Sequence, residues 1–362
     1  MPSTAWKTFF PMAGCAIFVT MTIFFFHDQH LNTRLCTMTR IVYNNITKVI
    51  NSTQLVDVTV TMPPMPLYYV TIKPPLTFLK EPIFIENDSC ARTECMGAVN
   101  KTWTMVIFVK TTVGNFQRRG ILRRTWGSVG SVGPARFHVV FVVGKIENTG
   151  RNNILVEEQE RFGDILQFDG PDDYKNIAQK TLAGMQWASN NLPGDYLYSS
   201  SDDDFMVNLG GLKDDVDNGF KQIEKKKWPE FPIMCGFIFG PKESPMRGES
   251  AKWYLSKLLY RWTVFPPYCH GGFYTTSVRV VGQLYELSRT VDPLPVDDVW
   301  ITGILRQKIG MPDEMIFRSP SNPGGHLNGF YGKGDIGKRG LMNDEWNNLY
   351  KTFKDRFRVC TC

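Results

Sequence analysis

The chain carries little net charge for its length and lacks the usual signatures of nucleic-acid binding. Its 41 lysine and arginine residues against 35 acidic residues give a net charge of +6 over 362 residues, which does not argue for a polyanionic partner. No zinc-finger spacing or RNA-binding motif occurs. No C-x-x-C pair or Cys/His cluster occurs either, so structural zinc is not indicated.

Histidine is also scarce, at five residues. His270 lies beside a glycine pair, but no nucleophile is evident near it, so histidine-driven nucleophilic catalysis is not favoured. The chain is instead rich in apolar and aromatic residues, at 43% and 13% of the total, which suits a well-packed core. Its length allows two average domains, or one large α/β domain with additional segments.

One long uncharged run lies near the N-terminus, from Phe9 to Phe26. Its eighteen residues fall within the range of about 17–25 that a membrane-spanning helix requires. Trp6 suits the membrane interface, and Lys7 marks the cytoplasmic side. A cleaved signal peptide is the alternative, but its apolar region is usually about 7–15 residues long and no convincing A-x-A site follows. We therefore expect a cytoplasmic tail at 1–8 and an uncleaved signal-anchor at 9–26.

Four N-x-S/T triplets follow the apolar run. Each could carry a glycan only in the secretory lumen. Their asparagines are Asn45, Asn51, Asn87 and Asn100. Because all four cluster after the expected anchor, the bulk of the chain is predicted to be lumenal.

Cysteine usage is compatible with an oxidising lumen. Cys15 lies inside the apolar run, and the lumenal cysteines are Cys36, Cys90, Cys95, Cys235, Cys269, Cys360 and Cys362. Spacing does not reveal which of them pair. Their odd number leaves at least one thiol that is unpaired or that links two chains, so a disulfide-linked homodimer is an open alternative.

The segment from 27 to 98 is expected to be a lumenal stem, because prolines interrupt any regular element in it. A compact domain is expected from 99 to 362. Strands are predicted at 104–112 and 136–144, and helix and strand patterns follow in VEEQERFG and DILQF. A helix is predicted over 172–190, directly before the next strand. This alternation predicts an α/β fold with a mostly parallel sheet and helices on both faces.

Three adjacent carboxylates, Asp202, Asp203 and Asp204, follow that strand in YLYSSSDDDFMVN. Burying them unpaired would cost several kcal/mol. A loop that holds a divalent cation resolves the conflict, since Mg²⁺ and Mn²⁺ take oxygen ligands. A solvated acidic turn is the alternative. Ligands of such sheets bind at the carboxyl ends of strands, where this loop is expected to lie.

Two further segments carry candidate site residues. Arg119 and Arg123 are four residues apart and would share a helix face, a spacing suited to a diphosphate, although a solvated basic face is the commoner explanation. Asp298 opens an amphipathic segment, where it would be a helix cap or a general base. Gly271 and Gly272 would let the backbone approach a ligand closely.

Taken together, these segments resemble the β-1,3-galactosyltransferase family of type II Golgi glycosyltransferases. The resemblance covers roughly 104–305, and five motifs occur in the right order. They are Arg119-x-x-x-Arg123-Arg124-Thr125-Trp126-Gly127, Asp172-x-Tyr174-x-Asn176 with Lys180-Thr181, Asp202-Asp203-Asp204-Phe205 with Val207-Asn208, Pro266-Pro267-Tyr268-Cys269 with Gly271, and Asp297-Asp298-Val299.

The resemblance implies a GT-A-like nucleotide-sugar-binding fold and an inverting transferase that uses a UDP-sugar and Mn²⁺. Asp202 and Asp204 would hold the metal on the diphosphate. Asp203 would help to fix the ribose or sugar of the donor, and Asp298 would take the proton from the acceptor hydroxyl. The other donor-binding residues would be Arg119, Arg123, Lys180 and Gly271. The family also implies a Golgi membrane protein that transfers a hexose, galactose first, to the 3-hydroxyl of a glycan on glycoprotein or glycolipid.

Three residues depart from the family pattern. Ser200 stands where a lysine usually precedes the first metal-loop aspartate, Trp300 replaces a tyrosine, and Phe273 replaces a glycine. None of these changes removes a carboxylate, so activity is still expected. The same motifs would serve a β-1,3-N-acetylglucosaminyltransferase. A catalytically silent lumenal lectin or calcium-binding module is the alternative from another class.

Overall fold

The computed structural model of the chain describes residues 73–83, 103–240, 242–319, 332–333 and 359–361. The strands are β1 (Phe78–Lys80), β2 (Trp103–Lys110), β3 (Val129–Val132), β4 (Ala135–Lys145), β5 (Ile165–Pro171), β6 (Leu197–Asp202), β7 (Phe205–Met206), β8 (Ile233–Cys235), β9 (Ile238–Phe239), β10 (Tyr268–Cys269), β11 (Phe273–Ser277), β12 (Ile316–Arg318), β13 (Gly332–Lys333) and β14 (Val359–Thr361). The helices are α3 (Phe116–Arg124), α4 (Thr149–Phe162), α5 (Ile177–Asn191), α6 (Leu209–Lys226), α7 (Val278–Ser288), α8 (Arg306–Lys308), the π-helix η4 (Val299–Leu305), and the 3₁₀ turns η2 (Trp126–Ser128), η3 (Tyr174–Asn176) and η5 (Asp313–Met315).

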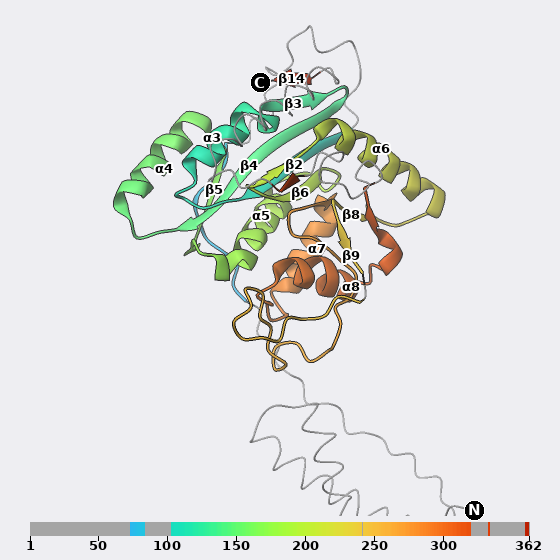
Figure 1. Ribbon diagram of the computed structural model, residues 1–362. Coiled ribbons are helices and arrows are strands. Elements are labelled where there is room, and N and C mark those ends of the chain that lie inside the picture. The colour runs from blue at the N-terminus through green and yellow to red at the C-terminus, as the bar shows by residue number, and fades with distance from the viewer. Residues whose placement is uncertain (1–72, 84–102, 241, 320–331, 334–358, 362) are drawn as a thin grey trace, which may run out of the picture. The chain divides into compact units, whose positions relative to one another are not determined.

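One large sheet organises these elements in the order β1-β5-β4-β2-β6-β11-β8-β12 (Figure 1). Its four central strands, β5, β4, β2 and β6, are mutually parallel. β11 runs antiparallel between β6 and β8, and β12 is parallel to β8. The predicted α/β architecture with a mostly parallel central sheet is thus confirmed, and it fits a GT-A-like fold.

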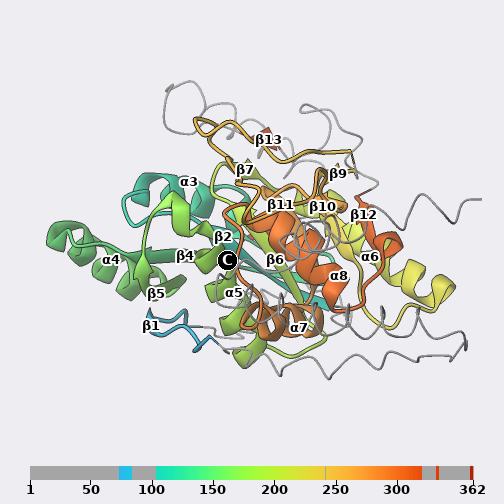
Figure 2. The ribbon, with the colours of Figure 1, turned by 90° about the horizontal axis from the view of Figure 1, so that it is seen from below.

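The sheet is buried on both faces, and strand periodicity assigns each side chain to one of them. In β2, Val106 and Phe108 join a core with α5 and α7, whereas Met105, Ile107 and Val109 join a core with α3 and α6. Seen from below in Figure 2, α3 and α7 lie on opposite sides of the sheet. Because every residue of β2 is buried, this strand fixes the position of whatever follows its carboxyl end.

The packed domain begins earlier in the chain than position 99. β1, from the segment expected to be stem, pairs antiparallel with β5. Trp187 of α5 donates its indole N–H to Glu81. The side chain of Gln186 accepts from the backbone amide of Leu76 and donates to the backbone carbonyl of Leu76. Residues 73–83 therefore form part of the domain surface and not of a separate stem.

The expected anchor and all four acceptor asparagines lie outside the described residues. Within the described ranges, no helix is both long enough and apolar enough to cross a bilayer.

The parallel strands end at one edge of the sheet. β2 and β6 are in register there, with Lys110 paired opposite Asp202. The helix expected from 172 starts at Ile177, because Asp173 caps a 3₁₀ turn before it through the amide of Asn176. These loops and caps line the edge at which the candidate site lies.

Candidate functional site

A cleft of about 440 Å³ opens at the carboxyl edge of β2 and β6. Its walls come from the ends of these strands, the start of α5, the glycine pair after β10 and the segment before η4. Among the residues that line it are Lys110, Lys180, Asp202, Asp203, Asp204, His270, Gly271, Asp297 and Asp298. The fold therefore gathers carboxylates from two distant segments, around 203 and around 298, into one cavity.

The three aspartates after β6 have different surroundings. Asp202 and Asp204 are half-buried where they line the cleft, whereas Asp203 is buried. Asp203 accepts hydrogen bonds from the guanidinium of Arg118 at 2.6 Å, the hydroxyl of Thr111 at 2.6 Å and the amide of Asn115 at 3.0 Å. Its two oxygens thus tie the loop to the end of β2 and to α3, while the residue also lines the cleft.

Lys110, the last residue of β2, occupies the centre of the site. Its buried ammonium lies 3.2 Å from Asp202 Oδ1 and 3.6 Å from Asp297 Oδ2, and it donates to the carbonyl of Gly271 at 3.0 Å. Burial alone would lower the pKa of Lys110, but the two carboxylates hold that pKa well above its ordinary value. One cation therefore joins the three segments that build the cleft.

Asp297 and Asp298, like the three aspartates after β6, differ in the partners of their carboxylates. Asp297 is buried, and its Oδ2 accepts from the hydroxyl of Thr181 at 2.7 Å as well as facing Lys110. Asp298 is paired with no cation within the described part of the chain. Its Oδ1 accepts from the amide of Val299 at 2.8 Å, and its Oδ2 accepts from the amide of Gly271 at 2.9 Å.

Burial raises the pKa of the Asp298 carboxyl from 3.8 to about 7, and the charge of Asp297 acts in the same direction. The two amides and the ammonium of Lys110 oppose the rise without cancelling it. A carboxyl group poised near neutrality is the kind that can accept a proton in a reaction.

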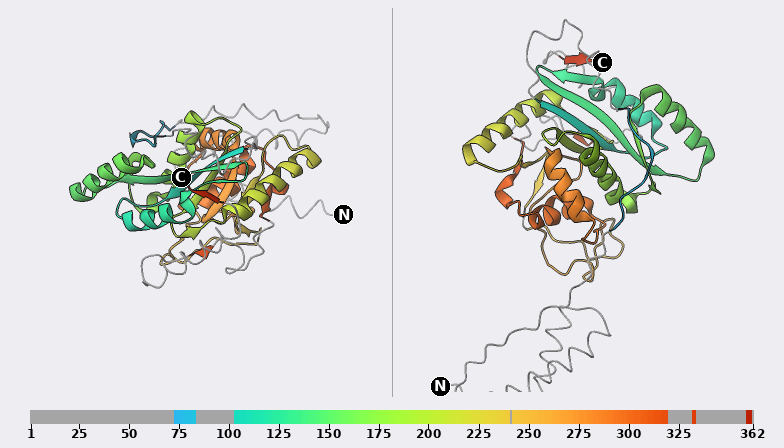
Figure 3. Two further views of the ribbon diagram at one scale, coloured as in Figure 1. Left: turned by 90° about the horizontal axis from the view of Figure 1, so that it is seen from above. Right: turned by 180° about the vertical axis from the view of Figure 1, so that it is seen from behind.

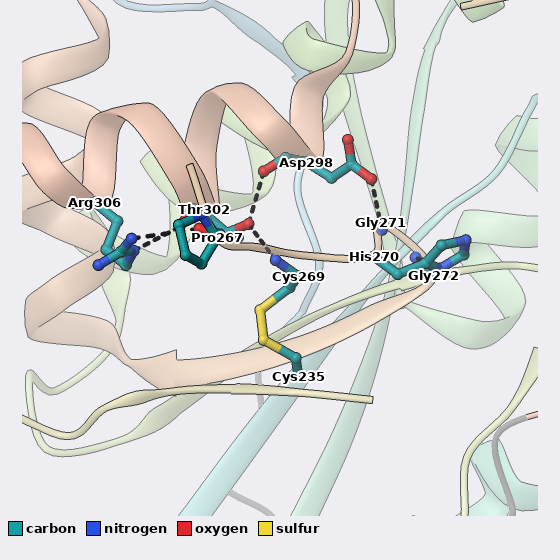
Figure 4. The surroundings of a disulfide bond; sticks show 9 residues. All are labelled: Cys235, Pro267, Cys269, His270, Gly271, Gly272, Asp298, Thr302 and Arg306. Atoms are coloured by element: carbon teal, nitrogen blue, oxygen red, sulfur yellow. Dashed lines mark hydrogen bonds between the residues drawn. A yellow bond between two sulfur atoms is a disulfide. The ribbon is translucent and has the colours of Figure 1, made fainter. Parts of the chain in front are cut away.

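Figure 4 shows what holds Asp298 in place. The hydroxyl of Thr302, one turn along η4, donates to the carbonyl of Asp298 and accepts from the amide of Cys269. Cys269 in turn forms a disulfide with Cys235, the last residue of β8. The base candidate is therefore connected through η4 and this disulfide to the sheet, and one pairing that spacing left open is settled.

The cleft wall is tightly packed around Gly271 and Gly272, and at 272 it leaves no room for a side chain. A Cβ at 272 would lie 2.0 Å from the ring of Phe205, which starts β7. A Cβ at 271 would lie 3.3 Å from Asp298 Oδ2. Nδ1 of His270 accepts from the amide of Gly272 at 3.1 Å, which places the proton of a neutral ring on Nε2.

Lys180 lines the cleft from α5, but its ammonium is engaged within the protein. It forms an ion pair with Asp172 and donates to the carbonyl of Thr111 at 2.6 Å. Asp172 also accepts from the amides of Val113 and Gly144. This cluster locks the loop after β2 to the ends of β4 and β5, so Lys180 supports the cleft wall.

Arg119 and Arg123, which were expected to support the nucleotide, do not line the cleft. Arg119 is fully buried, with a two-bond ion pair to Glu158 of α4 and further bonds to backbone carbonyls. Arg123 pairs with both Glu158 and Asp164. The i,i+4 spacing that suggested a diphosphate site instead serves to clamp α3 to α4.

Several cleft residues were given no role in the site by sequence reasoning. Lys110 is a strand-end residue whose role appears only when β2 and β6 are paired. Tyr174, Lys252 and Trp253 form part of the rim, with the indole of Trp253 donating to the hydroxyl of Tyr174 at 2.9 Å and the ammonium of Lys252 over the ring of Tyr174. The aromatic density of 252–254 was the available signal.

Comparison with known proteins places this site in a family. A sequence model described as galactosyltransferase matches residues 117–315. The chain is 30% identical over 221 residues to mouse beta-1,3-galactosyltransferase 5, covering 61% of this chain and 69% of the relative. It is 31% identical over 230 residues to the Drosophila melanogaster beta-1,3-galactosyltransferase brn, covering 62% and 68%.

A third relative differs in the sugar that its name gives. The human lactosylceramide 1,3-N-acetyl-beta-D-glucosaminyltransferase is 31% identical over 223 residues, covering 59% of this chain and 57% of the relative. The match spans the triple aspartate, the glycine pair and Asp298, the residues that line the cleft. The chain belongs to the galactosyltransferase family and is a glycosyltransferase.

Proposed function

We propose that the protein is an inverting, metal-dependent transferase that moves a hexose, galactose first, from a UDP-sugar to the 3-hydroxyl of a glycan. The observation that carries the proposal is the shared cleft, in which the half-buried Asp202 and Asp204 and the raised-pKa Asp298 come together. Asp202 and Asp204 are suited to bind a cation, and Asp298 is suited to accept a proton. Both groups are required for attack on a sugar carbon bonded to a diphosphate.

The oxygens at one end of the cleft fit a hard divalent cation such as Mn²⁺. Asp202 and Asp204 would hold it, a number of protein ligands typical of sites that share the ion with substrate phosphates. In the described ranges, no three His, Cys, Asp or Glu side chains are grouped so that they could hold a metal ion, so oxygens of the donor phosphates and of water would have to supply the remaining ligands. The cation would neutralise the charge that develops on the departing UDP.

The chain's own residues would position and deprotonate the acceptor. Asp298 accepts the proton of the attacking hydroxyl, while the amides of Gly271 and Val299 keep its carboxylate in one orientation. Lys110 forms ion pairs with both Asp202 and Asp297 and so holds these two carboxylates in place. Attack from the face opposite the leaving UDP gives a β-linkage.

The location of the protein is also proposed. The uncharged run at 9–26 and the four acceptor triplets support a single-pass type II protein of the Golgi membrane with a lumenal domain. The Cys235–Cys269 disulfide is consistent with an oxidising compartment. A disulfide-linked homodimer would involve cysteines other than these two.

A donor-by-acceptor screen of the full chain in detergent with Mn²⁺ tests the reaction. We expect the hexose of a UDP-hexose to be transferred to the acceptor glycan with formation of a β-1,3 linkage. Transfer of N-acetylglucosamine alone would favour the alternative that the human relative's name suggests. Absence of both transfer and UDP-sugar hydrolysis with every donor, while glycan binding persists, would instead support the lectin-like module.

Removal of one carboxylate tests the cation. We expect Asp204→Asn to abolish Mn²⁺-dependent transfer while leaving the melting temperature within a few degrees, because the side chain is half-buried and Asn is nearly the same size. Turnover is measured across a Mn²⁺ titration, with Asp214→Asn on α6, which is exposed, as the control. Full activity in the presence of a chelator would contradict metal dependence.

A further inference from the structure

The irregular segment between β9 and β10, residues 242–265, exposes a concentration of large apolar side chains. Six are exposed on it: Met246, Trp253, Leu258, Leu259, Trp262 and Val264. Eight others are spread over all the remaining described residues. Leu258 is the most exposed of the fourteen, at 78%. A surface of this kind usually indicates an interaction site, because apolar area left in water is unfavourable.

The backbone of this segment is held firmly. Arg247 donates to the carbonyls of Leu255, Tyr260 and Trp262 at 2.6–2.8 Å. Tyr260 is buried, donates its hydroxyl to the carbonyl of Val264 at 2.8 Å, and packs its ring against Phe265. The exposed side chains are therefore presented outward by a fixed backbone.

Cations accompany the apolar side chains. Between 250 and 264 the charged residues are Lys252, Lys257 and Arg261, with no acidic residue among them. Lys257 and Arg261 are exposed on either side of the leucine pair, and we call Lys257, Leu258, Leu259, Arg261 and Trp262 the interfacial patch. Basic residues next to leucine and tryptophan are typical of surfaces that lie at the boundary between lipid headgroups and acyl chains.

The first described residues of the domain lie beside this patch. Leu259 lines a second cavity, of about 480 Å³, together with Lys73 and Pro74, the first described residues. Lys73 and Pro74 therefore lie on the side of the domain that carries Leu259. Figure 1 and the right view of Figure 3 show this loop region at the opposite end of the domain from β3.

We propose that the interfacial patch binds the surface of a phospholipid bilayer, the one that the run at 9–26 is proposed to span, with Leu258, Leu259 and Trp262 among the headgroups and Lys257 and Arg261 on lipid phosphates. The same loop contributes Lys252 and Trp253 to the rim of the cleft. Binding would hold the cleft next to acceptors carried by lipids. The membrane contact rests on the proposed anchor and not on the proposed reaction, whereas this consequence for the acceptor rests on both.

Fluorescence quenching tests the contact without any activity measurement. The full chain is inserted into nanodiscs whose lipids carry brominated or ordinary acyl chains, with and without phosphatidylserine. The contribution of Trp262 is the difference between the chain and its Trp262→Phe variant. We expect brominated lipid to quench that contribution, and Lys257→Glu with Arg261→Glu to reduce the quenching several-fold in phosphatidylserine discs.

Turnover on matched acceptors tests the consequence. One glycan is offered as a water-soluble oligosaccharide and attached to a lipid in the same discs. Leu258→Ser with Leu259→Ser should raise the apparent KM for the lipid-borne form several-fold and leave kinetics on the soluble form unchanged. Ile154→Ser with Val156→Ser, which changes two exposed side chains on α4, is the matched control and should alter neither.

Two results would overturn the proposal. One is equal quenching of the chain and the Trp262→Phe variant by brominated lipid. The other is a dimer in detergent that Leu258→Ser dissociates, since the patch would then bind a second copy of the chain. Loss of transfer on both acceptors with Trp262 quenching retained would count against the proposed function and leave the membrane contact standing.

Discussion

At the scale of single residues, the candidate site depends on which groups donate hydrogen bonds or positive charge to each carboxylate. Asp203 and Asp297 are buried and bonded to cations and hydroxyls, so they act as fixed parts of the framework. Asp298 has only backbone amides as donors, and its pKa rises to about 7. This difference separates the residue that can exchange a proton from its sequence neighbour.

We expect Asp298→Asn to reduce turnover by about 10²–10⁴ because asparagine cannot accept the proton. In the unchanged chain, turnover should rise with pH and level off above about 7, the pKa of this carboxyl. Turnover per folded molecule, measured from about pH 5 to pH 9, checks both expectations. A variant with nearly normal turnover would move the base to Asp297 or to another residue.

The same variant should change how stability depends on pH. The folded-state pKa of Asp298 lies above its ordinary value of 3.8, so the folded protein binds more protons than the unfolded chain between about pH 4 and 7. This group therefore favours unfolding progressively as the pH rises through that window. The melting temperature of Asp298→Asn minus that of the unchanged chain should therefore be more positive at pH 8 than at pH 4.

Lys110 offers a second test at this scale. Lys110→Met would leave Asp202 and Asp297 without their shared cation, and removing one partner of a buried ion pair costs about 3–5 kcal/mol. Lys213→Met is the control, because that half-buried lysine pairs with Asp217 on the surface of α6 and should cost below about 1 kcal/mol. Urea unfolding gives both free energies of unfolding. Equal costs would mean that Lys110 is not the central cation of the site.

At the scale of elements, the site is made where separate segments are pressed together. The glycine pair after β10 contacts β7 on one side and Asp298, before η4, on the other. The Cys235–Cys269 disulfide and the Thr302 hydroxyl fix β10 against β8 and η4. A π-helix such as η4 is rare and often occurs at functional sites, in agreement with its place behind Asp298.

Gly272→Ala tests this packing. The added Cβ would lie 2.0 Å from Phe205, so β7 must shift, and overpacking of this kind typically costs about 1–3 kcal/mol. We expect lower turnover as well, because Phe205 follows Asp204 directly. Gly248→Ala, where no atom lies within 4 Å of the added carbon, should change stability by no more than about 0.5 kcal/mol. Equal behaviour of the two variants in thermal unfolding would contradict the tight contact.

At the scale of the whole molecule, the apolar run and the acceptor triplets predict one membrane anchor and a glycosylated lumenal part. We expect glycosidase treatment of the protein expressed in a secretory cell to lower its apparent mass. Single Asn→Gln changes at Asn45, Asn51, Asn87 and Asn100 identify the sites that are used. No mass shift for any of them would count strongly against a lumenal domain.

The sequence by itself determined the α/β class and the four parallel strands at the centre of the sheet. Continuous apolar strands and periodic helices are local patterns, and β2, β4 and α5 lie close to where these patterns predict them. The sequence also placed Asp202, Asp204, Gly271 and Asp298 as candidates, because their motifs are short and their order along the chain is specific.

Only the tertiary structure decided which charges face the cleft and which are bonded inside the protein. Arg119 and Arg123 have a spacing that suits a phosphate, yet Glu158 and Asp164 from distant parts of the sequence take up their guanidinium groups. Lys110 lies in no motif, yet the register of β2 with β6 brings it to Asp202. The physical reason is that a charge acts on what surrounds it in space, and those surroundings come from strand pairing and helix packing between residues far apart in the chain.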